Sequence, residues 1–251
     1  MSRDLRLNKA LARAGICSRR DADGLIFSGR VKINDEVVMK PGTRVDPARD
    51  RLSLDGRLLS LDTEIERSPV YVMLNKPVQV VTTMQDPGGR TSVTDLLPAA
   101  LNKLRLFPVG RLDYFSQGLL ILTNDGDLAH SLTHPSKKIP KVYKVRLRGD
   151  LTRGKLHYMR RGMVLQEGVN LAPVEVKILQ KKNDTVLAKM TLIQGVNRQI
   201  RRMCRDLDLV ILSLVRISQG PLSLGKLKSG EWRYLKPREV RMLQNYTKSS
   251  L

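Results

Sequence analysis

The segment Lys141-Val142-Tyr143-Lys144-Val145-Arg146-Leu147-Arg148 alternates apolar and charged side chains from Tyr143 onward. A period of two places Tyr143, Val145 and Leu147 on one face of an extended chain, as in a half-buried antiparallel strand. Other segments with the apolar or alternating pattern of strands are residues 70–74, 78–81, 119–122, 174–179 and 186–192. We therefore expect an α+β domain with a mainly antiparallel sheet.

A smaller module precedes this domain. Apolar residues recur at helical spacing over residues 7–14, and Gly15 is expected to end that helix. Ser18 and Asp21 form an S-x-x-D variant of the capping box, which predicts a second helix that ends at Gly29.

Two short strands are expected next, at residues 31–33 and 37–39, connected by Asn34-Asp35-Glu36. A polar stretch that is typical of a linker follows this module. The chain is thus predicted to contain a helix-turn-helix-plus-strands domain, a linker and the α+β domain, at residues 1–62, 63–69 and 70–251 respectively.

The 251 residues include 45 Lys+Arg and 24 Asp+Glu, which gives a formal net charge of +21. Such a surplus repels itself in a compact protein, and a polyanion such as nucleic acid would neutralise it. In the first module, nearly all charges opposite the apolar stripe have one sign, which favours a phosphate-binding face over an ordinary solvated one. The basic residues of this face are Arg6, Lys9, Arg13, Arg19, Arg20, Arg30 and Lys32.

Cysteine usage and hydropathy indicate the compartment. Cys17 and Cys204 lie far apart, and the sequence has no CxxC or Cys/His cluster, so neither a disulfide framework nor a zinc site is expected. The N-terminus lacks the apolar core of a secretory signal, and no apolar run approaches the ~20 residues of a membrane-spanning helix. We expect a cytoplasmic protein with no membrane partner.

Asp113 ends the stretch Gly110-Arg111-Leu112-Asp113, on a connection between two apolar segments. Loops held by a rigid sheet often carry catalytic side chains. A carboxylate there can be a nucleophile, a general base or the structural partner of an arginine. Spacing alone favours the structural role, because Arg-x-Asp pairs are common.

A helix is predicted where apolar residues recur at i, i+3, i+4 and i+7, namely at Ile200, Met203, Cys204 and Leu207. Arg201 lies at the border of this apolar face, about 100° around the helix from Ile200. From there its guanidinium can hold a buried carboxylate bidentately and keep it ionised. The arginines expected on the polar side, facing nucleic acid, are Arg198, Arg202 and Arg205.

Tyr143 faces the same side of its predicted strand as Val145 and Leu147. Inward tyrosines are most often core residues with a satisfied hydroxyl. The functional alternative is a stacking platform for a base taken out of its helix, which enzymes acting on nucleobases require.

Six blocks of sequence carry a family resemblance. Those of the second domain are Leu74-Asn75-Lys76-Pro77, residues 110–113 running into 118–126, residues 141–145, residues 197–203 and residues 220–233. They resemble, in order, the RsuA family of bacterial ribosomal-RNA pseudouridine synthases. The first module resembles, at residues 14–20 and 29–31, the alpha-L RNA-binding motif named after the fourth small-subunit ribosomal protein.

This resemblance implies that Asp113 is the essential aspartate, that Tyr143 stacks on the target base and that Arg201 pairs with the aspartate. It implies that the uracil N1–ribose bond breaks and that the base rejoins the ribose through C5, with neither metal nor organic cofactor. Arg111, beside the aspartate, is expected to contact ribosomal RNA, and the protein is expected to be a monomer. Whether the aspartate attacks the ribose or the base, or first removes a ribose proton, stays open.

One departure from the family pattern follows the aspartate, where Tyr114-Phe115-Ser116-Gln117 replaces small or polar residues and a threonine. These aromatics, with the loop at residues 85–90, are expected to influence substrate choice, and the RNA of either ribosomal subunit stays possible. The competing interpretation is a non-catalytic RNA-binding or ribosome-assembly protein. A metal-dependent nuclease is disfavoured because no second carboxylate or histidine cluster accompanies Asp113.

Overall fold

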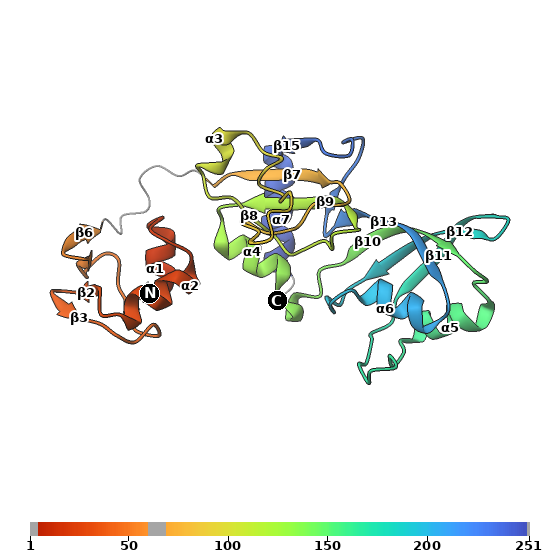
Figure 1. Cartoon of the computed structure of the whole chain (residues 1–251), viewed down its shortest axis with the longest axis horizontal. Helices are drawn as coiled ribbons and strands as arrows, with labels where there is room; N and C mark the ends of the chain where they lie inside the picture. The colour runs from red at the N-terminus through yellow and green to blue at the C-terminus, as the bar shows by residue number, and fades with distance from the viewer. Residues whose placement is uncertain (1–4, 60–68, 250–251) are drawn as a thin grey trace. The chain divides into compact units, whose positions relative to one another are not determined.

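The computed structural model describes residues 5–59 and 69–249. The chain divides into two compact units, Met1–Ser68 and Pro69–Leu251 (Figure 1). The expected linker at residues 63–69 lies outside the described residues except for Pro69.

The first unit begins with two short helices, α1 (Leu7–Arg13) and α2 (Arg19–Phe27). The Ser18 side chain accepts a hydrogen bond from the Asp21 amide at 3.2 Å, so the predicted N-cap is confirmed. Gly15 and Gly29 follow the two helices with φ angles of +75° and +68°, which glycine adopts without steric cost. The apolar faces of both helices meet in one small core, whose fully buried members include Leu7, Leu11, Ile26, Val31 and Leu52.

A four-stranded sheet in the order β3-β2-β5-β6 completes this unit. Its strands are β2 (Val31–Ile33), β3 (Glu36–Val37), β5 (Leu52–Leu54) and β6 (Arg57–Leu59). The short strands β1 (Leu5–Arg6) and β4 (Arg44–Val45) pair separately. Asn34 and Asp35 both have positive φ and form the turn, so Glu36, which we expected in the turn, belongs to β3.

The second unit is built on a large sheet in the order β11-β12-β10-β13-β9-β7-β15. These strands are β7 (Tyr71–Lys76), β9 (Gln117–Thr123), β10 (Lys141–Arg148), β11 (Glu175–Lys182), β12 (Thr185–Leu192), β13 (Val210–Gln219) and β15 (Trp232–Tyr234). The strands β8 (Phe107–Pro108) and β14 (Leu222–Ser223) pair at its side with β9 and β13. The β9–β13 pair is parallel and the other strand pairs of the described residues are antiparallel, which confirms the predicted sheet type.

Layers on both faces explain the continuous apolar runs of β7 and β9. Alternate side chains of the two strands pack on one face with α4 (Gly126–Thr133) and α7 (Pro237–Ser249), and on the other with α3 (Ala99–Asn102). In a third hydrophobic cluster, side chains of β10, β11 and β12 pack with those of α5 (Arg153–Arg161) and α6 (Gln199–Asp206). Figure 1 shows α4 and α7 beside β7 and β9, and α5 and α6 at the other end of the sheet.

The prediction of a strand at residues 78–81 is wrong. Residues 78 and 79 form a turn in which Gln79 has φ +61° and Val78 is exposed, and Val81 makes only an isolated bridge to Ser92. The Lys76 ammonium donates hydrogen bonds to the carbonyls of Pro77 (2.8 Å) and Val80 (2.7 Å). These bonds fold the segment back on itself, so it cannot continue as a strand.

Gly118 brings β9 close to β13. It has φ +114°, and a Cβ atom there would lie 2.2 Å from the Arg216 carbonyl oxygen. Only glycine allows this approach. Gly118 pairs with Arg216, and Arg216 pairs on its other side with Tyr143 of β10, so the register aligns these three residues across neighbouring strands.

Candidate active site

Asp113 lies on the loop between β8 and β9, and this loop is fixed from several sides. The Ser116 amide donates to the Asp113 carbonyl at 2.9 Å, which closes a turn. The Gln79 amide donates to the Tyr114 carbonyl at 2.7 Å. The Thr82 hydroxyl donates to the Leu112 carbonyl at 2.7 Å. The turn after β7 therefore supports the backbone on both sides of Asp113.

Arg201 of α6 reaches this loop. Its Nε lies 3.5 Å from Oδ2 of Asp113, with the two side chains 17% and 26% exposed. Its Nη2 donates to the Phe115 carbonyl at 2.9 Å and to the Ser116 hydroxyl at 3.1 Å. Burial lowers the pKa of the Arg201 guanidinium and the Asp113 charge opposes that shift, but an arginine stays protonated in either case. The Arg201 guanidinium thus contacts both the Asp113 carboxylate and the turn at residues 115 and 116.

Helix α6 presents Arg201 as its apolar spacing predicts. Ile200, Met203 and Cys204 are buried in the cluster that α6 shares with the sheet. Burial raises the pKa of the Cys204 thiol to about 12, so Cys204 is an inert core residue. Arg201 is half-buried at the border of this face, which orients it towards the Asp113 loop.

Tyr143 lies where two clusters meet. Its partly buried ring packs against the cluster that contains Leu112, the neighbour of Asp113, and against the cluster that contains Ile200, the neighbour of Arg201. The structure therefore brings Asp113, Tyr143 and Arg201 into one region of the second unit.

Two buried cations in this region were not predicted as site residues from the sequence. Lys76, at the end of β7, has no exposed surface, and Arg216 is 2% exposed. Burial lowers the pKa of Lys76 to about 8, although the Asp113 charge opposes this shift. Arg216 donates through Nε to the Leu119 carbonyl at 2.8 Å. A lysine that ends an apolar strand was the available signal for Lys76, whereas nothing local distinguishes Arg216 from other basic residues.

The remaining arginines of α6 have different surroundings. Arg202 and Arg205 both pair with Glu167, at 2.6 and 2.7 Å, and Arg205 also pairs with Asp206. Arg198 is exposed just before the helix, with φ +52°. A pocket of about 380 Å³ next to this helix is lined by Arg198, Arg201, Arg205, Asp208, Leu209, Val210 and Ile211. Three arginines and one aspartate thus line this pocket, and one of the arginines is Arg201, the partner of Asp113.

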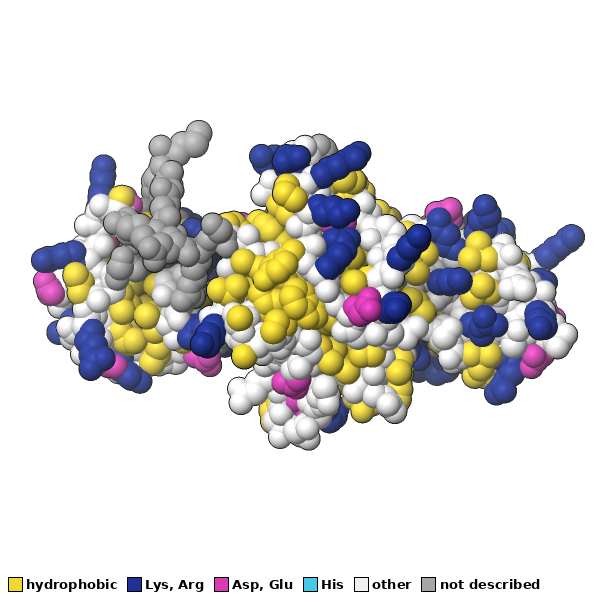
Figure 2. Space-filling model, turned by 90° about the horizontal axis from the view of Figure 1, so that it is seen from above, with side chains coloured by type: hydrophobic (Ala, Val, Ile, Leu, Met, Phe, Trp, Pro, Cys, Tyr) yellow, Lys and Arg dark blue, Asp and Glu magenta, His cyan; other side chains and the backbone are white. Residues whose placement is uncertain are grey.

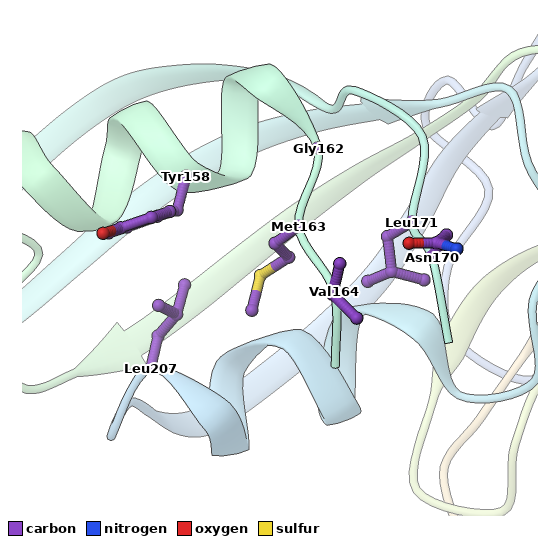
Figure 3. Close-up of a pocket in the computed structure, with 7 residues that line it drawn as sticks. All are labelled: Tyr158, Gly162, Met163, Val164, Asn170, Leu171 and Leu207. Carbon is purple, nitrogen blue, oxygen red and sulfur yellow. The ribbon is translucent and has the colours of Figure 1, made fainter. Parts of the chain in front are cut away.

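A larger pocket, of about 500 Å³, is lined by Tyr158, Gly162, Met163, Val164, Asn170, Leu171 and Leu207. Figure 3 shows its side chains between α5 and the end of α6. None of Asp113, Tyr143 and Arg201 lines it.

The basic residues predicted on the first unit are mostly accessible. Arg6, Arg13, Arg19, Arg20 and Lys32 are exposed, and Lys9 is half-buried. Arg30 makes a two-bond ion pair with Asp55, at 2.8 and 2.5 Å. In the second unit Arg111 is exposed. Figure 2 shows that Lys and Arg side chains predominate over acidic ones on the visible face.

Two kinds of feature are absent from the described parts of the chain. No group of three or more His, Cys, Asp and Glu side chains there could hold a metal ion. Within residues 5–59 and 69–249, no helix combines the length and hydropathy that crossing a membrane requires.

Comparison with known proteins identifies both units. The family model described as S4 domain matches residues 5–50, and that described as RNA pseudouridylate synthase matches residues 70–206. Ribosomal large subunit pseudouridine synthase B of Bacillus subtilis is 39% identical over 242 residues, which cover 95% of each chain. An uncharacterised RNA pseudouridine synthase of Aquifex aeolicus is 37% identical, over 96% of this chain and 94% of the relative.

Among solved structures, a crystal structure of a pseudouridylate synthase matches with a TM-score of 0.68 and 28% identity, over 95% of this chain and 99% of that one. The expected resemblance and the α+β fold with an N-terminal RNA-binding domain are thus confirmed. The chain belongs to the RNA pseudouridylate synthase family: it is an enzyme that isomerises uridine to pseudouridine in RNA.

Proposed function

We propose that this enzyme modifies uridine in ribosomal RNA of the large subunit and that Asp113 is its nucleophile. The observation that carries the proposal is the contact between Asp113 and Arg201, because it joins two separate sequence blocks at one partly accessible carboxylate. The choice of RNA is supported by the Bacillus subtilis relative, whose name specifies the large ribosomal subunit and whose similarity extends over nearly all of both chains.

The reaction determines what the site must do. The N1–C1′ bond of uridine breaks, the base turns, a C5–C1′ bond forms, and the hydrogen at C5 is exchanged for one at N1, so the product is an isomer. A nucleophile must be ionised and pointed at the substrate. Arg201 supplies a positive charge at 3.5 Å from the Asp113 carboxylate. In our proposal this charge holds the carboxylate in place.

The base must stay bound while it is detached from the ribose. Tyr143, half-buried and packed against the two hydrophobic clusters that contain Leu112 and Ile200, is proposed to stack on the uracil and to limit its escape. Exposed or half-buried cations are proposed to hold the RNA backbone through phosphate contacts. The cations assigned to this role are Arg111 and Arg198 in the second unit and Arg6, Lys9, Arg13, Arg19, Arg20, Arg30 and Lys32 in the first.

Asp113→Asn tests the nucleophile. The amide is isosteric but cannot act as an anionic nucleophile, so pseudouridine formation should fall by at least about a thousandfold with RNA affinity within threefold of wild type. Loss of the C5 hydrogen gives a direct assay, namely tritium release from large-subunit RNA transcribed with [5-³H]uridine. Turnover close to wild type in this variant would refute the assignment.

The choice of RNA needs a separate experiment. Pseudouridines are mapped in the RNA of both ribosomal subunits from cells with and without this protein. A site in large-subunit RNA that disappears with the protein supports the proposal. Loss of a site in small-subunit RNA alone would contradict the choice of subunit, and unchanged maps would favour the non-catalytic RNA-binding interpretation.

A further inference from the structure

Phe115 combines a fixed backbone with an exposed aromatic ring. Its carbonyl accepts a hydrogen bond from Arg201 Nη2 at 2.9 Å, and it lies in the turn that the Ser116 amide closes onto Asp113. Its side chain is nevertheless 59% exposed. The backbone of Phe115 is thus held to the two central residues of the site, while its phenyl group remains in water.

Neighbouring segments extend this exposed surface. The Tyr114 ring meets the Phe115 ring edge to face, at a centroid distance of 5.0 Å and an angle of 79°. The Gln79 amide bonds the Tyr114 carbonyl, and next to Gln79 the side chain of Val78 is 44% exposed. The rim of the site is therefore aromatic and apolar.

The chemistry of this rim fits a nucleobase. Stacking of a base on an aromatic side chain is a general feature of single-strand recognition, and adjacent arginines serve the phosphates. An enzyme that reacts at the C1′ of one nucleotide must take that nucleotide out of its stack, which leaves the neighbouring bases without a stacking partner. An exposed ring that is anchored to the nucleophile loop is well placed to take over that role.

We propose that Phe115 is a stacking platform for an unpaired nucleobase next to the target uridine. That this base lies next to the target uridine rests on the proposed function. Stacking of a base on Phe115 can be tested independently of that function. The rigid attachment of Phe115 to Arg201 also fixes the distance between the platform and Asp113. Phe115 is then a positioning residue that contributes to the choice of RNA.

The test compares two RNA probes of equal charge and length, a uridine decamer and a decamer of abasic ribose phosphate. Their affinities for the full chain are measured by fluorescence anisotropy. Phe115→Ala should weaken binding of the uridine decamer roughly 5- to 150-fold, as expected for the loss of one stacked base. It should change binding of the abasic decamer less than twofold. Phe115→Trp should restore base-dependent binding to within threefold of wild type.

Tyr158→Ala is the matched control, since Tyr158 is 60% exposed in the same unit but lines the separate pocket beside α5. It should leave both affinities unchanged. The platform is overturned if wild type does not distinguish the two decamers, or if Phe115→Ala weakens both equally or neither. Tritium release from large-subunit RNA by wild type is measured in parallel. If Phe115→Ala loses affinity for the uridine decamer alone, but wild type releases no tritium, base stacking on Phe115 is supported and the proposed function is rejected.

Discussion

Removal of the Arg201 guanidinium is the sharpest test of how the site is built. In Arg201→Ala, Asp113 loses the cation 3.5 Å from its Oδ2. The Phe115 carbonyl and the Ser116 hydroxyl lose a donor at 2.9 and 3.1 Å. One substitution therefore removes the counter-charge of the carboxylate and a support of the loop that carries it.

The size of the effect follows from the geometry. At 3.5 Å and an effective dielectric constant of about 20, the attraction between the two charges is about 5 kcal/mol. Desolvation of both groups offsets part of this energy, and removal of one member of a buried pair typically costs about 3–5 kcal/mol. Since both side chains keep some exposed surface, we expect about 3–4 kcal/mol, or roughly a 150- to 900-fold loss in kcat/KM.

Single-turnover tritium release with enzyme in excess measures this loss, and circular dichroism shows whether the variant is folded. Arg201→Lys should lose less than Arg201→Ala, because an ammonium keeps the charge but lacks the planar fork that contacts carboxylate and turn together. Arg153→Ala, an exposed arginine of α5 in the same unit, should stay within twofold of wild type. A folded Arg201→Ala with less than a tenfold loss would refute this account of the ion pair.

Three further perturbations have defined outcomes. Gly118→Ala places a Cβ 2.2 Å from the Arg216 carbonyl oxygen and should lower the free energy of unfolding, measured by thermal denaturation, by at least about 3 kcal/mol. The control Gly230→Ala also has a positive φ but open space around the added Cβ, and it should cost only about 1 kcal/mol. Equal losses in the two variants would contradict the close approach of β9 and β13 as the cause. Burial lowers the pKa of Lys76 to about 8, so between that pH and about 10.5 the unfolded chain binds more protons. In wild type, the unfolding free energy should thus rise with pH over this window by up to about 3–4 kcal/mol relative to Lys76→Met. Parallel curves of unfolding free energy against pH for the two proteins, measured by urea titration, would refute the burial of a charged lysine. Simultaneous replacement of Arg19, Arg20 and Lys32 of the first unit by alanine should reduce the slope of log K for RNA binding against log salt concentration by roughly 2–3. An unchanged slope would exclude phosphate contacts from these three side chains.

Local patterns in the sequence predicted much of this fold. Alternation over residues 141–148 matches β10, because one face of that strand packs in the core and the other is exposed. The Ser18 cap was predictable because its partner lies three residues away. Arg201 was predictable because helical spacing alone places it at the border of the buried face of α6.

Contacts between distant segments could not be predicted in this way. Val78–Val81 has the composition of a strand, yet the buried ammonium of Lys76 folds it into a turn. Arg202 and Arg205 seemed equally available on the polar side of their helix, but Glu167 from another segment pairs with both. In each case a tertiary interaction overrides a local preference, and the periodicity of one sequence does not encode it.

The site depends on a junction that neither half of the sheet provides alone. Asp113 belongs to the loop that leads into β9, and Arg201 belongs to a helix whose apolar face packs at the far end of the sheet. β13 pairs with β9 on one side and with β10 on the other, and the close approach at Gly118 sets the spacing at this point. Because Arg201 contacts the carboxylate and the Phe115–Ser116 turn with the same guanidinium, a shift of the junction would move the proposed nucleophile and the exposed aromatic ring together. The spacing between the proposed nucleophile and the proposed stacking platform at Phe115 then depends on the sheet register as well as on their own loop.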